Sequence, residues 1–120
     1  MSDHANSFGN KRKIINIKDA TYNPYDFGGP ILEGITQLDL TYDHKTGHGA
    51  YVIRMEPGTQ TTGHVHSVRE QYLILEGDIV ESDGTVLGTG DFVIYEPGTE
   101  HNSRTVNGCL LIGIDYPVTS

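Results

Sequence analysis

Apolar residues in this chain fall in short runs separated by glycine, proline and polar residues, and no run keeps helical spacing for three turns. Short runs of this kind are typical of β-strands joined by tight turns. The pattern therefore predicts an all-β protein. The predicted strands of the main body cover residues 35–42, 50–55, 61–68, 70–75, 78–81, 85–87, 92–95, 101–105 and 109–116.

Turn signals separate these strands. Asp83-Gly84 and Asn107-Gly108 are dipeptides that signal β-hairpin turns. The tetrapeptide Glu-Pro-Gly-Thr occurs twice, at 56–59 and at 96–99, each time ahead of a histidine-bearing strand. Two copies are too few to build a repeat architecture. We interpret them as equivalent turns at one mouth of a small barrel.

The first 30 residues differ from the rest in composition. Residues 1–13 are polar and end in a Lys-Arg-Lys triplet, and the three isoleucines within 14–17 predict a short strand that pairs with the main body or with a second subunit. We therefore divide the chain into an N-terminal arm with an irregular segment, residues 1–30, and a β-barrel, residues 31–120. A chain of 120 residues fits one such domain.

Charge and composition exclude several partners. The chain carries 8 basic and 16 acidic residues, a net charge of −8, which argues against binding to nucleic acid or to anionic membranes. No apolar run reaches the length of a membrane span, and the N-terminus lacks the apolar core of a signal peptide. The lone cysteine, Cys109, forms no intramolecular disulfide, which fits a reducing compartment. We expect a cytoplasmic protein.

Three histidines and one glutamate form the candidate chemistry. His64 and His66 lie two residues apart on a predicted strand, so their side chains project from the same face. Glu70 follows after a tight turn, and His101 follows the second Glu-Pro-Gly-Thr turn. A His-x-His pair alone is more often a coincidence than a metal site. With the added carboxylate and third imidazole, the set suits one divalent ion of Fe, Mn, Ni, Cu, Co or Zn and leaves open positions for small ligands.

Residues 58–77 resemble the first signature motif of the cupin superfamily, with its glycines, histidines and glutamate all in place. Residues 90–101 are similar to the second motif, although the proline comes one residue late, as Pro97, and Thr105 replaces a terminal asparagine. The resemblance implies a cupin barrel, which is a double-stranded β-helix or jelly roll. It also implies a metal ion held by His64, His66, Glu70 and His101.

Residues 95–109 are further similar to the cupin half of ChrR-type anti-sigma factors and to small dioxygenases that cleave β-diketones and hydroxylated acetophenones. This resemblance implies a dioxygenase, with Fe(II) as the favoured metal, that cleaves a small β-diketone-like or hydroxyaryl-ketone substrate. Two alternatives remain open. One is a non-redox metal-dependent isomerase, lyase or cyclase, and the other is a module that senses a metal or small ligand without turnover.

Four other residues are candidates for substrate contact or proton transfer. Tyr72 is expected to face the metal cavity, as an acid–base partner or as a packed tyrosine with one hydrogen bond. Glu96 is a candidate acid–base carboxylate at the cavity mouth, with a solvent-exposed turn residue as the alternative. Arg54 is expected to bind an anionic substrate if it faces inward, and to be a solvated charge if it faces outward. Tyr95 is a further candidate for substrate contact.

A second copy of the chain is the expected protein partner. Residues 73–75 and 110–112 are apolar on both faces, which the wall of a single barrel does not need. A homodimer that buries the outer face, with residues 14–17 paired across, accounts for this pattern.

Overall fold

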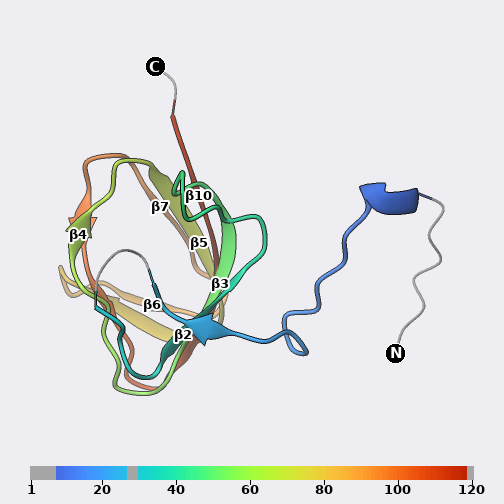
Figure 1. The fold of residues 1–120 in the computed structure, drawn as a ribbon. Helices are drawn as coiled ribbons and strands as arrows, with labels where there is room; N and C mark the ends of the chain where they lie inside the picture. The colour runs from blue at the N-terminus through green and yellow to red at the C-terminus, as the bar shows by residue number, and fades with distance from the viewer. Residues whose placement is uncertain (1–7, 27–29, 119–120) are drawn as a thin grey trace.

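The computed structural model describes residues 8–26 and 30–118, which form a curled β-barrel and an N-terminal arm that leads away from it (Figure 1). A single 3-10 turn, η1 (Gly9–Lys11), lies on the arm, and the other elements of these residues are strands. The predicted all-β class is confirmed. The strands are β1 (Asn23–Pro24), β2 (Ile35–Asp39), β3 (Gly49–Met55), β4 (His64–Val65), β5 (Arg69–Glu81), β6 (Val86–Gly88), β7 (Phe92–Tyr95), β8 (Glu100–His101), β9 (Ser103–Arg104) and β10 (Cys109–Tyr116).

Most strands belong to one sheet that curls around the core. Its order is β1-β2-β3-β10-β5-β6, and β7 and β9 are also hydrogen-bonded to β5. A separate small sheet consists of β4 and β8. At 13 residues β5 is the longest strand, and it pairs antiparallel with β6, β7, β9 and β10. The barrel is therefore assembled around β5.

β5 bends where the sequence predicts a break between two strands, with Leu75 as an extra residue in its pairing with β10 and Gly77 two residues later. Gly77 has a φ of 86°, and a Cβ built there would lie 1.9 Å from the carbonyl oxygen of Gly108. Only glycine fits this position without a shift of the backbone. Even-numbered residues of β5 are buried before the bend and odd-numbered residues after it. One strand thus continues through both halves of the barrel, but its buried face changes parity.

The turn at Asn107-Gly108 is not the hairpin that the sequence predicts. β9 and β10 both pair with β5 and run in the same direction beside it, so the turn interrupts one antiparallel run instead of reversing the chain. Asp78 explains this geometry, because its carboxylate accepts hydrogen bonds from the backbone N–H groups of Val106 and Asn107 at 2.8 and 3.1 Å. The hairpin predicted at Asp83-Gly84 is correct and joins β5 to β6.

The two Glu-Pro-Gly-Thr segments form the same turn. In each, the threonine N–H donates to the glutamate carbonyl across 3.2 Å, and the threonine hydroxyl donates to the same oxygen. Their glycines have φ values of 81° and 91°, the left-handed conformation that a type II turn requires after proline. The first turn leads toward β4 and the second leads into β8, and these two strands pair with each other.

The inner faces of the strands enclose an apolar core of nine buried residues. Side chains on β10 alternate between buried and more exposed positions, as expected for a strand with one face on the core. The core residues are Ile35, Tyr51, Ile53, Met55, Tyr72, Ile74, Ile79, Cys109 and Leu111.

The outer face of the main sheet also carries an apolar row. The strand register aligns Leu38, Val52, Ile112, Leu73 and Phe92 across five neighbouring strands, and we name these residues the outer row. Val52 is fully buried although it is outside the inner core, whereas Phe92 is 57% exposed. The outer row therefore buries its middle and exposes its end on β7.

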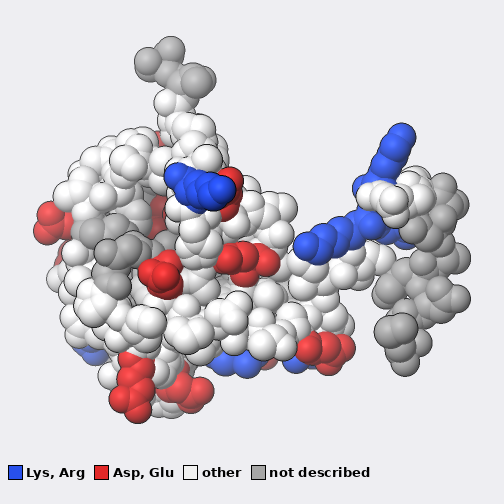
Figure 2. Space-filling view, viewed as in Figure 1, with Lys and Arg blue, Asp and Glu red and all other residues white. Residues whose placement is uncertain are grey.

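The N-terminal arm leaves the barrel instead of running along one of its edges (Figure 1). Residues 14–17 form no strand with the barrel, and their pairing with a second subunit stays a prediction; the chain first joins the sheet at β1. Figure 2 shows Lys and Arg gathered on the arm, whereas Asp and Glu predominate over the visible face of the barrel. The parts of the expected N-terminal segment at 1–7 and 27–29 lie outside the described residues. No helix within 8–26 or 30–118 has the length and apolar character that a membrane crossing needs.

Candidate functional site

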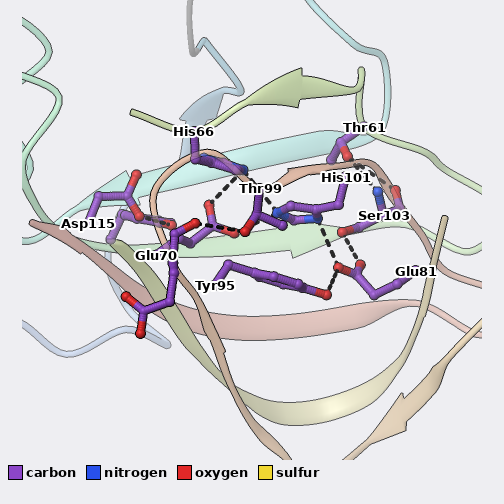
Figure 3. Close-up of polar contacts among 11 residues, drawn as sticks. Thr61, His66, Glu70, Glu81, Tyr95, Thr99, His101, Ser103 and Asp115 are labelled. Carbon is purple, nitrogen blue, oxygen red and sulfur yellow. Dashed lines mark hydrogen bonds and ion pairs between the residues drawn. The ribbon is translucent and has the colours of Figure 1, made fainter. Parts of the chain in front are cut away.

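His66, Glu70 and His101 bring their side chains together inside the barrel (Figure 3). The Nε2 atoms of His66 and His101 are 2.9 Å apart, and Nε2 of His101 lies 3.0 Å from Oε1 of Glu70. Nε2 of His66 lies 3.6 Å from the other oxygen of Glu70. The side chains are only 6–11% exposed. Three of the four predicted metal ligands therefore share one buried cluster.

The fourth predicted ligand, His64, is described in its backbone only. It belongs to β4, where it pairs with His101 of β8. Its side chain lies outside the described part of the structure, so its role as a ligand stays a prediction.

The segment that carries His66 is a shorter strand than the predicted 61–68. Pairing continues on both sides of β4, through an isolated bridge from Gln60 to Arg104 and through a 3.0 Å hydrogen bond from the His66 N–H to the Thr99 carbonyl. The register slips by one residue between that bridge and β4, which interrupts the ladder. The segment is thus fixed by hydrogen bonds on both flanks without being a regular strand.

His101 lies between two buried carboxylates (Figure 3). Its Nε2 faces Glu70, and its Nδ1 is 2.8 Å from Oε2 of Glu81. Burial lowers the pKa of His101, but the hydrogen bonds and charges of the two carboxylates outweigh it and raise the pKa to about 9. The surroundings of this ring therefore favour a positive charge, whether a proton or a metal ion.

Glu81 is a buried carboxylate beside the cluster that the sequence pattern misses. It ends β5, is 4% exposed, and accepts hydrogen bonds from the hydroxyls of Tyr95 and Ser103. Burial raises the pKa of Glu81, but the close contact with His101 and the hydrogen bonds from Ser103 and Tyr95 together lower it below its usual value. The sequence signal that points to Glu81 is the glycine within β5, because a glycine inside a strand pattern indicates a bulge that changes which residues face inward.

A cavity of about 50 Å³ adjoins the cluster. Ile53, Met55 and Leu111 supply apolar walls. Tyr72 also lines the cavity, as predicted, and its hydroxyl is buried without a hydrogen-bond partner. Burial is the main reason that the pKa of Tyr72 is raised, so the phenol is protonated at neutral pH. The cavity therefore offers one unused hydroxyl donor close to the His and Glu side chains.

Arg54 and Glu96, the candidates for anion binding and acid–base chemistry, are not among the residues that line this cavity. Arg54 alternates with buried residues on β3, so its side chain points outward, where the guanidinium lies 4.4 Å from the centre of the Tyr22 ring. Glu96 begins a turn and is 60% exposed, and its carboxylate is 2.8 Å from Nε of Arg69. Arg54 is thus an outward-facing charge and Glu96 a solvent-exposed turn residue, as the alternative interpretation of each had it.

Tyr95 lies behind His101 instead of lining the cavity. The two rings stack with centroids 4.2 Å apart and an interplanar angle of 19°. The Tyr95 hydroxyl donates to Glu81. Tyr95 therefore supports the histidine ring, and no contact of Tyr95 with the cavity is seen among the described residues.

Asp115 is a further buried carboxylate near the cluster. It lies opposite Glu70 in the register of β5 and β10 and accepts a 2.8 Å hydrogen bond from the Tyr51 hydroxyl. Burial, followed by the negative charge of Glu70, raises the pKa of Asp115 to about 7. Asp115 is therefore partly protonated at neutral pH, and its negative charge grows as the pH rises.

The sequence of the whole barrel matches a known family. A profile described as the ChrR Cupin-like domain covers residues 10–118. The chain belongs to this cupin family. The jelly-roll class predicted from the two signature motifs is thereby confirmed. A comparison of this cupin with curated proteins found no significant match.

Solved structures with the same fold have varied descriptions. An acetylacetone dioxygenase from Acinetobacter johnsonii is 16% identical with a TM-score of 0.73, over 95% of this cupin and 80% of that chain. The polyketide cyclase RemF from Streptomyces resistomycificus is 19% identical with a TM-score of 0.72, over 87% and 78%. A chain of the complex between Rhodobacter sphaeroides SigE and the anti-sigma ChrR is 18% identical with a TM-score of 0.67, over 84% and 51%, so this cupin spans about half of it. At these identities the likeness shows the fold alone.

The donor atoms at the site fit a divalent metal ion. One ligand atom from each of His66, Glu70 and His101 lies within 4.8 Å of the others. Two imidazole nitrogens and a carboxylate are a donor set that suits transition metals from Mn to Zn. The cluster is also buried and rich in negative charge, which offsets the cost of burying a cation. A His/Glu/His metal site is thus available in this cupin.

Proposed function

We propose that this cupin is a metal-dependent dioxygenase that cleaves a small β-diketone-like substrate. The observation that carries the proposal is a single cavity that combines the His66, Glu70 and His101 cluster, apolar walls and the unpartnered hydroxyl of Tyr72. The three clustered residues, together with His64, would hold the metal, and Fe(II) is the favoured ion. When bound, this ion supplies redox chemistry toward O₂ and a Lewis acid for substrate oxygens.

The protein's own groups would bind and orient the substrate. The protonated phenol of Tyr72 can donate a hydrogen bond to an enolate oxygen, and the apolar side chains of Ile53, Met55 and Leu111 can contact alkyl groups. The same walls exclude bulk water, which strengthens the hydrogen bond from Tyr72. In the balanced reaction one C–C bond breaks and both atoms of O₂ enter the products, a carboxylic acid and an α-dicarbonyl compound. The substrate is oxidised and O₂ is the oxidant.

The size of the cavity favours the smaller of the two expected substrate classes. A volume of about 50 Å³ corresponds to roughly three to five water positions. A short aliphatic diketone needs less rearrangement of this cavity than a hydroxyaryl ketone does. The fold likeness to acetylacetone dioxygenase supports the same choice, whereas the likeness to a polyketide cyclase keeps a non-redox reaction as the second candidate.

Oxygen uptake by the iron-loaded protein tests this proposal. With acetylacetone we expect one O₂ consumed per substrate cleaved, and no turnover when Zn²⁺ replaces iron. Tyr72→Phe should lower the rate roughly 100-fold because it removes one donor to the developing charge. Tyr116→Phe is the matched control, because Tyr116 bonds to Arg69 outside the cavity. Substrate loss without oxygen uptake would assign the site to the isomerase, lyase or cyclase class, and saturable binding without turnover would assign it to sensing.

We also propose that the protein acts as a homodimer. The outer row ends at the exposed ring of Phe92, and the arm carries Ile14, which is 49% exposed, beside its basic triplet. The basic arm of one copy is complementary in charge to the acidic barrel of another (Figure 2). Sedimentation should give twice the 13.2 kDa of one chain. Phe92→Lys should shift the mass toward the monomer, whereas Val86→Lys, at an exposed position outside the outer row, should not; a monomeric parent protein contradicts the proposal.

A further inference from the structure

A buried carboxylate lies behind the candidate metal site and belongs to none of the predicted ligands. Glu81 is 4% exposed at the end of β5 and accepts hydrogen bonds from the hydroxyls of Tyr95 and Ser103 (Figure 3). Burying a carboxylate this deeply costs free energy unless its oxygens accept hydrogen bonds or face a positive charge. Two hydroxyl donors leave accepting capacity on the oxygen atoms, and that capacity faces His101.

The two nitrogens of His101 face different carboxylates. Nε2 is 2.9 Å from Nε2 of His66 and 3.0 Å from Oε1 of Glu70, so it points into the cluster. Nδ1 is 2.8 Å from Oε2 of Glu81. The N–H at Nδ1 is not aligned for a hydrogen bond, and no other acceptor within the described residues reaches it. Glu81 is therefore the acceptor available to this nitrogen.

The orientation of the His101 ring is also fixed by a residue that is hydrogen-bonded to Glu81. The stacked ring of Tyr95 lies 4.2 Å from that of His101, and its hydroxyl is tied to Glu81. Ser103 follows His101 by two residues and donates to the other carboxylate oxygen. Glu81 at Nδ1 and the stacked ring of Tyr95 thus both contact His101, and the hydrogen bonds of Tyr95 and Ser103 to Glu81 connect these groups.

A neutral imidazole can ligate a metal only through the nitrogen that carries no proton. We propose that Glu81 is a positioning residue that keeps the proton of His101 on Nδ1 and so leaves Nε2 free to bind the metal ion. The inference rests on the metal site of the proposed function, but it is independent of the reaction catalysed there. Carboxylates that fix ligand histidines in this way contribute 10–100-fold to metal affinity in other proteins.

Zn²⁺ affinity, measured by competition with a chromophoric chelator, tests the proposal. Glu81→Gln keeps the size of the side chain but removes its charge, and we expect it to weaken Zn²⁺ binding by roughly 10–100-fold. Glu76→Gln is the matched control, since it makes the same change at an exposed residue of the same strand and should stay within about twofold of the parent. An affinity for Glu81→Gln within twofold of the parent overturns the proposal.

Substitutions that remove the hydroxyls of Tyr95 and Ser103 distinguish a specific role of Glu81 from an effect of general packing around the site. Tyr95→Phe and Ser103→Ala each delete one hydrogen bond to Glu81 but leave its charge beside His101. Each should weaken Zn²⁺ binding less than Glu81→Gln does. An equal loss in all three variants would mean that general packing holds the site, and it would overturn the specific role of Glu81.

The ring nitrogens of His101 can be observed without any substitution. In ¹⁵N-labelled, Zn²⁺-loaded protein, long-range ¹H–¹⁵N spectra should show the proton of His101 on Nδ1 and the metal on Nε2. A proton on Nε2 would overturn the proposal even if Glu81→Gln failed to fold. The Zn²⁺ measurements require no redox step, so they test this inference separately from catalysis. If the iron-loaded protein showed no oxygenase activity, the proposed function would be contradicted but this inference would not.

Discussion

A single carboxylate, Asp78, anchors the turn that joins β9 to β10. It accepts hydrogen bonds from the Thr105 hydroxyl at 3.0 Å, from Val106 N–H at 2.8 Å and from the Asn107 side chain at 2.8 Å. Burial raises the pKa of Asp78, but these hydrogen bonds outweigh it and lower the pKa below its usual value. The folded protein therefore favours the ionised form, and Asp78 stabilises the fold most where it is fully charged.

We expect Asp78→Asn to lower the free energy of unfolding at pH 7 by about 1–2 kcal/mol, a range discounted for partial solvent exposure. Since its folded pKa is depressed, the contribution of Asp78 is complete above its unfolded pKa of about 3.9 and disappears as the pH falls through the lower folded value. Urea unfolding between pH 3 and pH 7 should thus show the two proteins converging at low pH. Asp19→Asn, at an exposed residue outside the barrel, is the control. A difference that does not depend on pH would contradict this account.

At the scale of residues, motif spacing predicted the cluster of His66, Glu70 and His101 better than it predicted the side chains around that cluster. His66, Glu70 and His101 meet because the turn at 96–99 leads into β8 beside β4. Arg54 could not be assigned to a face, because the sequence does not show which side of β3 is the core. Glu81 could not be found by counting from Glu70, because the bend in β5 changes the parity of the buried face.

At the scale of elements, the bend in β5 depends on one glycine. We expect Gly77→Ala to destabilise the protein by at least about 2 kcal/mol more than Gly84→Ala. Both glycines have positive φ, at 86° and 90°, so both substitutions carry backbone strain. Only at Gly77 would the new Cβ meet a backbone carbonyl, whereas at Gly84 nothing lies within 4 Å. Equal shifts of the urea midpoint in the two variants would refute the steric explanation.

Strand predictions succeeded best for segments that pair with the long strand β5. Residues 92–95 and 109–116 form β7 and β10 with the predicted bounds, and the burial of side chains alternates along both strands. Of the predicted strand 61–68, only two residues are a strand in the structure. The slip in register that shortens it depends on how two distant segments pair, which the local sequence does not show. Residues 14–17 have strand-forming side chains but leave the barrel, and Asn107-Gly108 has hairpin chemistry but is redirected by Asp78.

At the scale of the whole molecule, a metal ion at this site would cross-link separate segments of the chain. His66 follows β4, Glu70 lies in β5, and His101 ends β8. We expect Zn²⁺ at about 100 times its dissociation constant to raise the free energy of unfolding by about 2.7 kcal/mol, because it binds the folded state only. His101→Ala should abolish this gain, and His48→Ala, in a loop outside the barrel core, should retain it. Differential scanning calorimetry with and without Zn²⁺ measures both, and an unchanged Tm in the parent protein would contradict a bound metal.

β5 shares backbone hydrogen bonds with β6, β7, β9 and β10, so none of these four strands can leave the sheet without opening a side of β5. Its amide protons should therefore exchange with solvent only through the global unfolding of the barrel, as a single cooperative unit. Amides of the arm at 12–17 should exchange within the dead time of the same experiment in the monomer. β5, which carries both Glu70 and Glu81, should then have the slowest amide exchange in the protein. The two carboxylates around His101 would therefore keep their positions until the barrel unfolds.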